Sequence, residues 1–200
     1  MLKMKKGCVV PFPERLQPSY ETGPHGFLAN VGADQIDAMV RHFLAINDEP
    51  FFFILELPQN LRNENPETLH HTFHKEVYYL DGCTRERALS VLNRTGELLI
   101  QDGISSFGFG CHGSGDEIMS GKYNVVTVYT SQPQRYREAD FFAARGIPEV
   151  DRVVTAWDTF DQEHPGQARL WCEEGGRDAY SLPEELKEWG LYLAELREDT

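Results

Sequence analysis

A glycine-rich stretch in the middle of the chain is the first segment whose residue types suggest chemistry. Residues 108–113 read G-F-G-C-H-G, which matches the G-x-G-x-x-G pattern that lets a backbone approach a pyrophosphate at the start of a helix. No helix is expected to follow, because Gly115, Ser120 and Gly121 come before the next predicted strand. We therefore expect a glycine-rich connection between two strands and no nucleotide.

The same stretch places a thiol beside an imidazole. Cys111 and His112 are adjacent, and a thiolate activated by histidine is a common nucleophile. Neighbouring residues of a strand point to opposite faces of the sheet, however. A small buried thiol beside a surface histidine is therefore the expected arrangement, and no catalytic residue is assigned.

A histidine cluster is the candidate for metal binding. His70, His71 and His74 precede Glu76, and on a helix the first and third would share a face, as in H-E-x-x-H metalloenzymes. His71 occupies the place of that motif's glutamate. On a strand, positions four apart are separated by about 13 Å, which is too far for one ion. The residues up to Tyr79 favour a strand, so we expect solvated histidines, no metal and no cofactor.

Acidic and aromatic residues are interleaved in the last third of the chain. Aromatic anchors within a charged rim are typical of protein interfaces. The residues expected to bind a partner are Trp157, Asp158, Asp161, Glu163, Glu173 and Glu174. The alternative is that the tryptophans belong to the core and the carboxylates are only solvated.

The charge balance indicates which partners the chain can have. The chain has 19 Lys and Arg against 32 Asp and Glu, a net charge of −13, and we count 6 basic and 16 acidic residues in 138–200, a net of −10. Nucleic-acid backbones and anionic membranes are repelled by such a surface. A basic protein would be attracted.

Bulk composition indicates a soluble, cytoplasmic protein. No run approaches the roughly 20 apolar residues needed to span a membrane, and the basic start lacks the apolar stretch of a secretion signal. Cys8, Cys83, Cys111 and Cys172 form no C-x-x-C pair, so neither a zinc knuckle nor a redox pair is indicated. Reduced thiols are expected.

Hydrophobic periodicity predicts the elements that position these groups. Apolar residues at helical spacing predict helices over 32–46, 84–101 and 133–145, and a fourth from the capping box Ser181–Glu184 through Leu196. The expected strands are 8–12, 51–57, 70–80, 104–110, 122–130, 150–160 and 167–172.

Several strand pairs are joined by connections too short for a parallel crossover. The sequence therefore predicts a single α+β domain over 1–200, with a mixed, largely antiparallel sheet packed by three to four helices. Residues 1–31 are expected to form an irregular N-terminal arm, and 150–200 an acidic strand-helix extension.

The C-terminal segments Trp157–Phe160, His164–Gly166 and Leu182–Tyr192 resemble the tails of small acidic bacterial immunity proteins from polymorphic-toxin loci. That resemblance implies a cytoplasmic protein that binds a cognate toxin and blocks its active site. It implies no catalytic residue, because immunity proteins have no catalytic signature.

The leading hypothesis is a non-enzymatic protein that binds a basic toxin or nuclease through its acidic surface. The first alternative is a hydrolase-type enzyme with a site at loop 108–117, where His112, Asp116 and Glu117 would converge with His74 and Glu76. The second is a structural homo-oligomer that pairs through an exposed strand edge such as 123–130.

Overall fold

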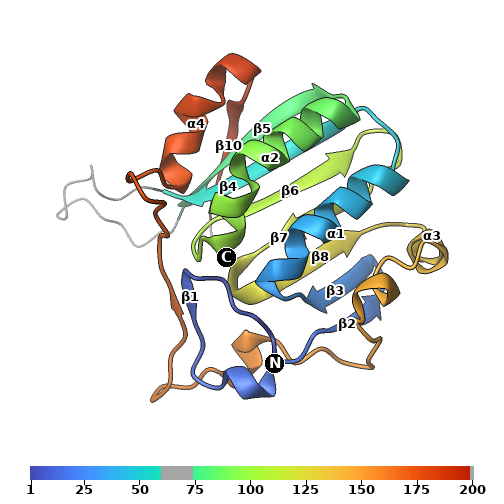
Figure 1. Cartoon of the computed structure of the whole chain (residues 1–200), viewed down its shortest axis with the longest axis vertical. Coiled ribbons are helices and arrows are strands. Elements are labelled where there is room, and N and C mark those ends of the chain that lie inside the picture. Colours follow the sequence, from blue (N-terminus) through green and yellow to red (C-terminus); the bar gives the residue numbers. More distant parts are fainter. Residues whose placement is uncertain (60–73, 199–200) are drawn as a thin grey trace.

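The computed structural model describes residues 1–59 and 74–198, and its centre is a large antiparallel sheet (Figure 1). The strands of this sheet are β2 (Ser19–Gly23), β3 (Gly26–Asn30), β4 (Phe51–Pro58), β5 (His74–Cys83), β6 (Ser106–Cys111), β7 (Glu117–Ser120), β8 (Val125–Tyr129) and β10 (Tyr192–Glu198). They lie in the order β10-β5-β4-β6-β7-β8-β3-β2. A small antiparallel sheet joins β1 (Cys8–Val9) to β9 (Gln167–Ala168).

Four α-helices occur in the described residues: α1 (Ala33–Ile46), α2 (Arg85–Gln101), α3 (Pro133–Glu138) and α4 (Leu182–Glu185). The first two begin one residue after the predicted start and end at the predicted residue. Thr84 caps α2, because its hydroxyl accepts a hydrogen bond from the Arg87 N–H. The α+β class is confirmed, with antiparallel pairing between all neighbouring strands. In the described ranges no helix is long and apolar enough to cross a membrane.

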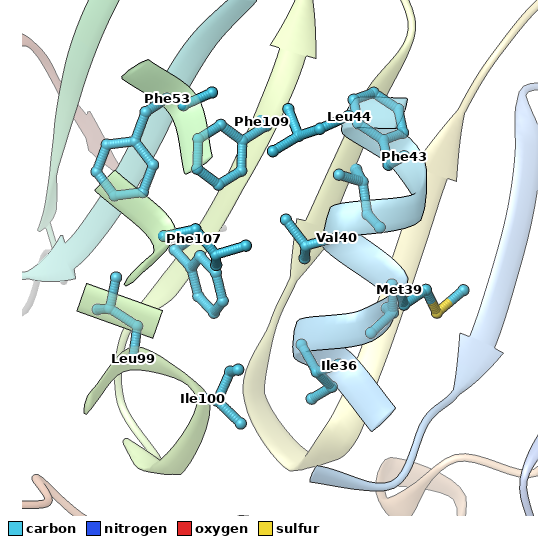
Figure 2. Packing of buried hydrophobic residues seen from close by; sticks show 14 of the residues in the cluster. Ile36, Met39, Val40, Phe43, Leu44, Phe53, Leu99, Ile100, Phe107 and Phe109 are labelled. Carbon is cyan, nitrogen blue, oxygen red and sulfur yellow. The ribbon is translucent and has the colours of Figure 1, made fainter. Parts of the chain in front are cut away.

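The core lies between the sheet and the two long helices. Figure 2 shows Val40 and Leu44 of α1 directed toward the aromatic side chains Phe107 and Phe109 of β6, with Leu99 and Ile100 of α2 near Phe107. The spacing of apolar residues explains both the helix side and the sheet side of this core. In α1 the buried residues form one stripe along the helix, and in β4 every second residue points into the core. Phe51, Phe53, Leu55 and Leu57 of β4 are fully buried.

The opposite face of the sheet carries more polar side chains. Cross-strand neighbours share a face, so Glu56 of β4 lies on the same side as Ser106 of β6 and Val77 of β5. Gly108 and Gly110 also lie on this side of β6. A Cβ on Gly110 would lie 2.1 Å from the Phe52 ring, and one on Gly108 would lie 2.0 Å from the Ile118 carbonyl oxygen. These glycines therefore allow close packing between neighbouring strands.

The N-terminal arm is more regular than predicted. Residues 1–31 contain the hairpin of β2 and β3, which adds two strands to the sheet by pairing with β8. The short Gly-Pro-His-Gly connection obscured this hairpin, since alternation over five residues is a weak signal beside so many prolines and glycines. The outer side of β2 is covered, because the Tyr20 N–H donates to Pro148 and the Val150 N–H donates to Tyr20.

The glycine-rich stretch forms a strand connection as expected. It joins β6 to β7 as an antiparallel hairpin, and β7 is a strand that the sequence did not predict. The predicted strand 122–130 begins instead with the 3₁₀ turn η4 (Lys122–Asn124), in which Tyr123 and Asn124 have positive φ values of 53° and 66°. Because β8 lies between β7 and β3, segment 123–130 is not an exposed edge, and that prediction is wrong.

The C-terminal third departs most from the prediction. Segment 150–160 contains the 3₁₀ turn η6 (Ala156–Thr159) and no strand, and only Gln167–Ala168 of 167–172 is a strand. The predicted final helix stops after α4 and the turn η8 (Lys187–Trp189), because Gly190 adopts a left-handed φ of 92°. The chain then forms β10 along β5. Tertiary pairing overrides a helical spacing of leucines here.

Candidate functional site

Trp157 lies in a turn that is fixed by a capping box. The Asp158 carboxylate accepts hydrogen bonds from the Thr155 N–H at 2.8 Å and the Thr155 hydroxyl at 2.9 Å, and it also binds Arg152 at 2.7 Å. The Thr155 hydroxyl in turn accepts a bond from the backbone N–H of Asp158. These donors, the Thr155 backbone first, lower the pKa of Asp158. The predicted box at Ser181 is absent, since the Ser181 hydroxyl donates to the Asp178 carbonyl.

Two aromatic rings support the indole from beneath. Trp157 packs edge-on against Tyr123 with ring centroids 4.8 Å apart and against Phe160 at 5.6 Å, and these two rings contact each other at 5.0 Å. Tyr123 is 5% exposed, whereas Trp157 is 56% exposed. We call Tyr123, Trp157 and Phe160 the aromatic platform. It holds a large apolar side chain in solvent in one orientation.

Two hollows meet at Trp157. One has a volume of about 400 Å³ and is lined by Tyr123, Trp157, Phe160, Asp161, Gln162, Pro165 and Gly166. The other has a volume of about 570 Å³ and extends over the polar face of the sheet, past Lys122 and Val125 to Glu56 and Lys75. The indole therefore separates a loop-walled hollow from a sheet-walled one.

The loop that follows the platform contains the polar side chains of Asp161, Glu163 and His164. Asp161 accepts hydrogen bonds from the N–H groups of Glu163 at 2.9 Å and His164 at 2.7 Å, and its carboxylate lies 3.1 Å from His164 Nδ1. The His164 N–H is the main cause of the lowered pKa of Asp161. Asp161 thus shapes this loop, as Asp158 shapes η6, while the Glu163 side chain is exposed to solvent.

The larger hollow continues into a third one of about 310 Å³, with which it shares Glu56, Lys75, Ser106, Gly121 and Val125. We call the two together the sheet groove. Ion pairs cross it, because Glu56 accepts from Lys75 at 2.9 Å and from Arg197 at 3.1 Å. Side chains from β4, β5 and β10 are thereby joined across the polar face.

Glu117 is the acidic group of this groove with the most perturbed environment. Burial raises its pKa, the nearby negative charge of Glu56 raises it further, and Arg197 partly opposes both. Its neighbours in the groove include Tyr79 and Tyr129. The groove therefore combines a carboxyl that resists ionisation with an ion-pair cluster.

The predicted partner-binding residues fall into two groups. Trp157, Asp158, Asp161 and Glu163 lie in or beside η6, as described above. Glu173 binds Arg177 at 3.0 Å, and Arg177 also binds Glu185 and the Arg94 carbonyl of α2. Glu173 therefore participates in a local ion-pair network that joins its loop to α2 and α4, and the exposed Glu174 follows it in the chain.

The four residues of the hydrolase hypothesis whose side chains the structure describes do not converge. His112 is half-exposed and lies 3.3 Å from Asp81, whereas Asp116 is 2% exposed and accepts a hydrogen bond from the Tyr136 hydroxyl at 2.8 Å on the core side. Glu117 points into the sheet groove. Glu76 accepts from the Tyr78 hydroxyl at 2.6 Å. The concave site that this hypothesis predicts is therefore not formed by these side chains.

The thiols of the described core are not activated. Burial raises the pKa of Cys83 and of Cys111 to about 11 and also raises the pKa of Cys8. A nucleophilic cysteine requires a lowered pKa. Cys111 is 1% exposed while His112 is half-exposed, so the predicted arrangement of a buried thiol beside a surface histidine is confirmed.

The histidine cluster lies mostly outside the described residues. His70 and His71 belong to the segment 60–73, and only His74 falls in a described strand, opposite Glu198. Within 1–59 and 74–198, no group of three or more metal-ligating side chains is close enough to hold an ion.

Sequence reasoning missed the residues that build the platform's support and the groove. Tyr123 was expected in a regular strand, and Lys75 and Arg197 come from strands more than a hundred residues apart. One signal was present, since Glu56 interrupts the otherwise apolar run 51–57 and a charge in a buried strand usually has a partner. Nothing local indicated which partner.

No family model, curated protein or solved structure matches this chain.

Proposed function

We propose that this chain is a protein-binding protein whose interface is centred on Trp157, and that its partner is a basic protein. The observation that carries the proposal is the aromatic platform: an indole 56% exposed, yet fixed between Tyr123 and Phe160. Tryptophan is enriched among the residues that dominate binding energies, especially where it is held rigidly beside hollows that a partner can fill.

Charge supports a basic partner. The last third of the chain has a net charge of −10. Asp158 is next to Trp157 in the sequence, Asp161 lines the hollow beside the indole, and Glu163 is an exposed residue of the same loop. Such a field accelerates association with a cationic surface and makes it dependent on salt. The C-terminal resemblance implies a cognate toxin as the partner, and a basic toxin or nuclease would have the charge that this surface attracts.

The test is capture of a partner from a lysate of the source organism, with the purified chain as bait and washes of rising salt. We expect one stoichiometric basic protein that dissociates as the salt concentration rises. Trp157→Ala should weaken the purified complex by at least about thirtyfold, the equivalent of a 2 kcal/mol hot spot. Glu163→Lys should slow association and reduce its salt dependence.

Two matched variants serve as controls. Tyr192→Ala removes another half-exposed aromatic side chain, which lies on β10 and lines neither hollow, and Glu188→Lys makes the same charge change on η8 as Glu163→Lys. Neither should alter the affinity. Equal binding by Trp157→Ala and the unaltered chain would overturn the proposal, as would a bait that retains no protein at any salt concentration.

A further inference from the structure

The two edges of the large sheet differ. The outer side of β2 is covered by residues 148–150, whose backbone exchanges hydrogen bonds of 2.9 and 2.8 Å with Tyr20. β10 is the strand at the other end, and no strand of the described residues pairs with its outer side. An uncovered edge presents a row of free N–H and C=O groups that can pair with another strand.

β10 also exposes large apolar side chains. Of the eight exposed large hydrophobic residues in the described chain, three lie on this one strand: Tyr192 at 49%, Leu193 at 48% and Leu196 at 60%. Edge strands of monomeric proteins are usually protected by covering segments, prolines or inward-pointing charges. Leucines on an edge with which no described strand pairs are instead what a pairing strand would bury.

The charges of β10 are complementary to those of a second, antiparallel copy. A bulge separates Leu193 from Glu195 in the pairing with β5, and the strand is regular over 195–198. If Leu196 lies opposite its own equivalent on a two-fold axis, Glu195 lies opposite the second copy's Arg197 and Arg197 lies opposite its Glu195. The two already pair within one strand, so the dimer would create a square of alternating charges on one face.

We propose that β10 is a dimerisation edge, which pairs antiparallel with β10 of a second copy of this chain about a two-fold axis at Leu196. A two-fold axis perpendicular to the sheet keeps both helical layers on the same side. The polar faces of the two sheets then become continuous. This surface is separate from the aromatic platform, so it stands or falls independently of the proposed function.

Sedimentation velocity over a concentration series from about 1 to 100 µM tests the proposal by mass action. The unaltered chain should convert from monomer to dimer. Leu196→Lys places two ammonium groups opposite each other at the axis, and Glu195→Arg places two arginines opposite each other at both flanking pairs. Each should raise the dissociation constant at least about tenfold, because like charges directly opposite are destabilising.

Val154→Lys is the control for Leu196→Lys, since Val154 is a 46% exposed apolar residue outside β10. Glu188→Arg is the control for Glu195→Arg. Both should dimerise like the unaltered chain, as should Trp157→Ala. Thermal unfolding confirms that each variant is folded, and if Leu196→Lys fails to fold, Glu195→Arg decides. A chain that remains monomeric throughout, or a dimer that Glu195→Arg leaves intact, would overturn the proposal.

Discussion

The ammonium group of Lys5 lies 2.7 Å from the carbonyl oxygen of Gly121 and 3.2 Å from the Ser120 hydroxyl, and Lys5 is only 1% exposed. Burial lowers its pKa to about 8, although the neighbouring acidic groups Cys8 and Asp102 act in the opposite direction. Lys5 thereby ties the N-terminal segment to the turn that carries Tyr123. The support of the aromatic platform depends on a buried, titrating side chain.

We predict that the stability of the protein reflects this titration. Between pH 8 and pH 10.5 the unfolded chain retains a proton that the folded chain has released, so raising the pH favours folding. The free energy of unfolding of the unaltered chain, minus that of Lys5→Met, should rise by up to about 3 kcal/mol across this range. Urea unfolding at a series of pH values measures it.

Subtracting the variant cancels the titration of tyrosines and cysteines, which both proteins share. Lys187→Met is the control, because the Lys187 side chain is 69% exposed. The free energy of unfolding of the unaltered chain minus that of Lys187→Met should not change with pH. If the Lys5→Met difference is also constant between pH 7 and pH 10, Lys5 is not buried as the structure shows.

A second prediction concerns the close approach of two strands at Gly110. Gly110→Ala should destabilise the protein by about 1–3 kcal/mol, because its Cβ would lie 2.1 Å from the Phe52 ring. Phe52→Ala removes that ring, so the double variant should lose less stability than the sum of the single ones. Thermal or urea unfolding of the four proteins gives the coupling energy.

Gly113→Ala is the matched control for that cycle. No atom lies within 4 Å of the position its Cβ would take, and the substitution should be nearly neutral. A harmless Gly110→Ala, or strict additivity with Phe52→Ala, contradicts the assignment of the G-x-G pattern to strand packing.

A third prediction concerns the raised pKa of Glu117. Burial, the charge of Glu56 and the partial opposition of Arg197 make the folded state favour the protonated carboxyl, so ionisation above its folded pKa costs stability. Glu117→Gln should therefore stabilise the protein at pH 7, and this gain should disappear as the pH falls below the ordinary value of 4.5. Urea unfolding at pH 4 and pH 7 measures the change.

The exposed Glu188 provides the comparison, since Glu188→Gln should leave stability unchanged at both values. A Glu117→Gln protein that is less stable than the original at pH 7 would show that Arg197 outweighs burial, and the sheet groove would then be an ordinary ion-pair network.

The sequence by itself predicted those elements whose signal is local. The stripe of Ile36, Val40 and Phe43 predicted α1, and the apolar run 51–57 predicted β4. Short connections predicted antiparallel pairing, and the glycine-rich stretch predicted a hairpin. Each of these inferences depends on the period of a helix or strand, which neighbouring residues determine.

Only the tertiary structure decided which strands form the edges and which side chains meet. Leu193 and Leu196 have helical spacing from Trp189, yet Gly190 ends the helix and the edge of β5 recruits the segment as β10. Tyr123 lies beneath Trp157 because a left-handed turn at residues 123–124 interrupts a segment that was predicted to be a strand. Pairings between distant segments depend on backbone hydrogen bonds and burial that no local pattern encodes, so neither β10 nor the aromatic platform could be predicted from the sequence.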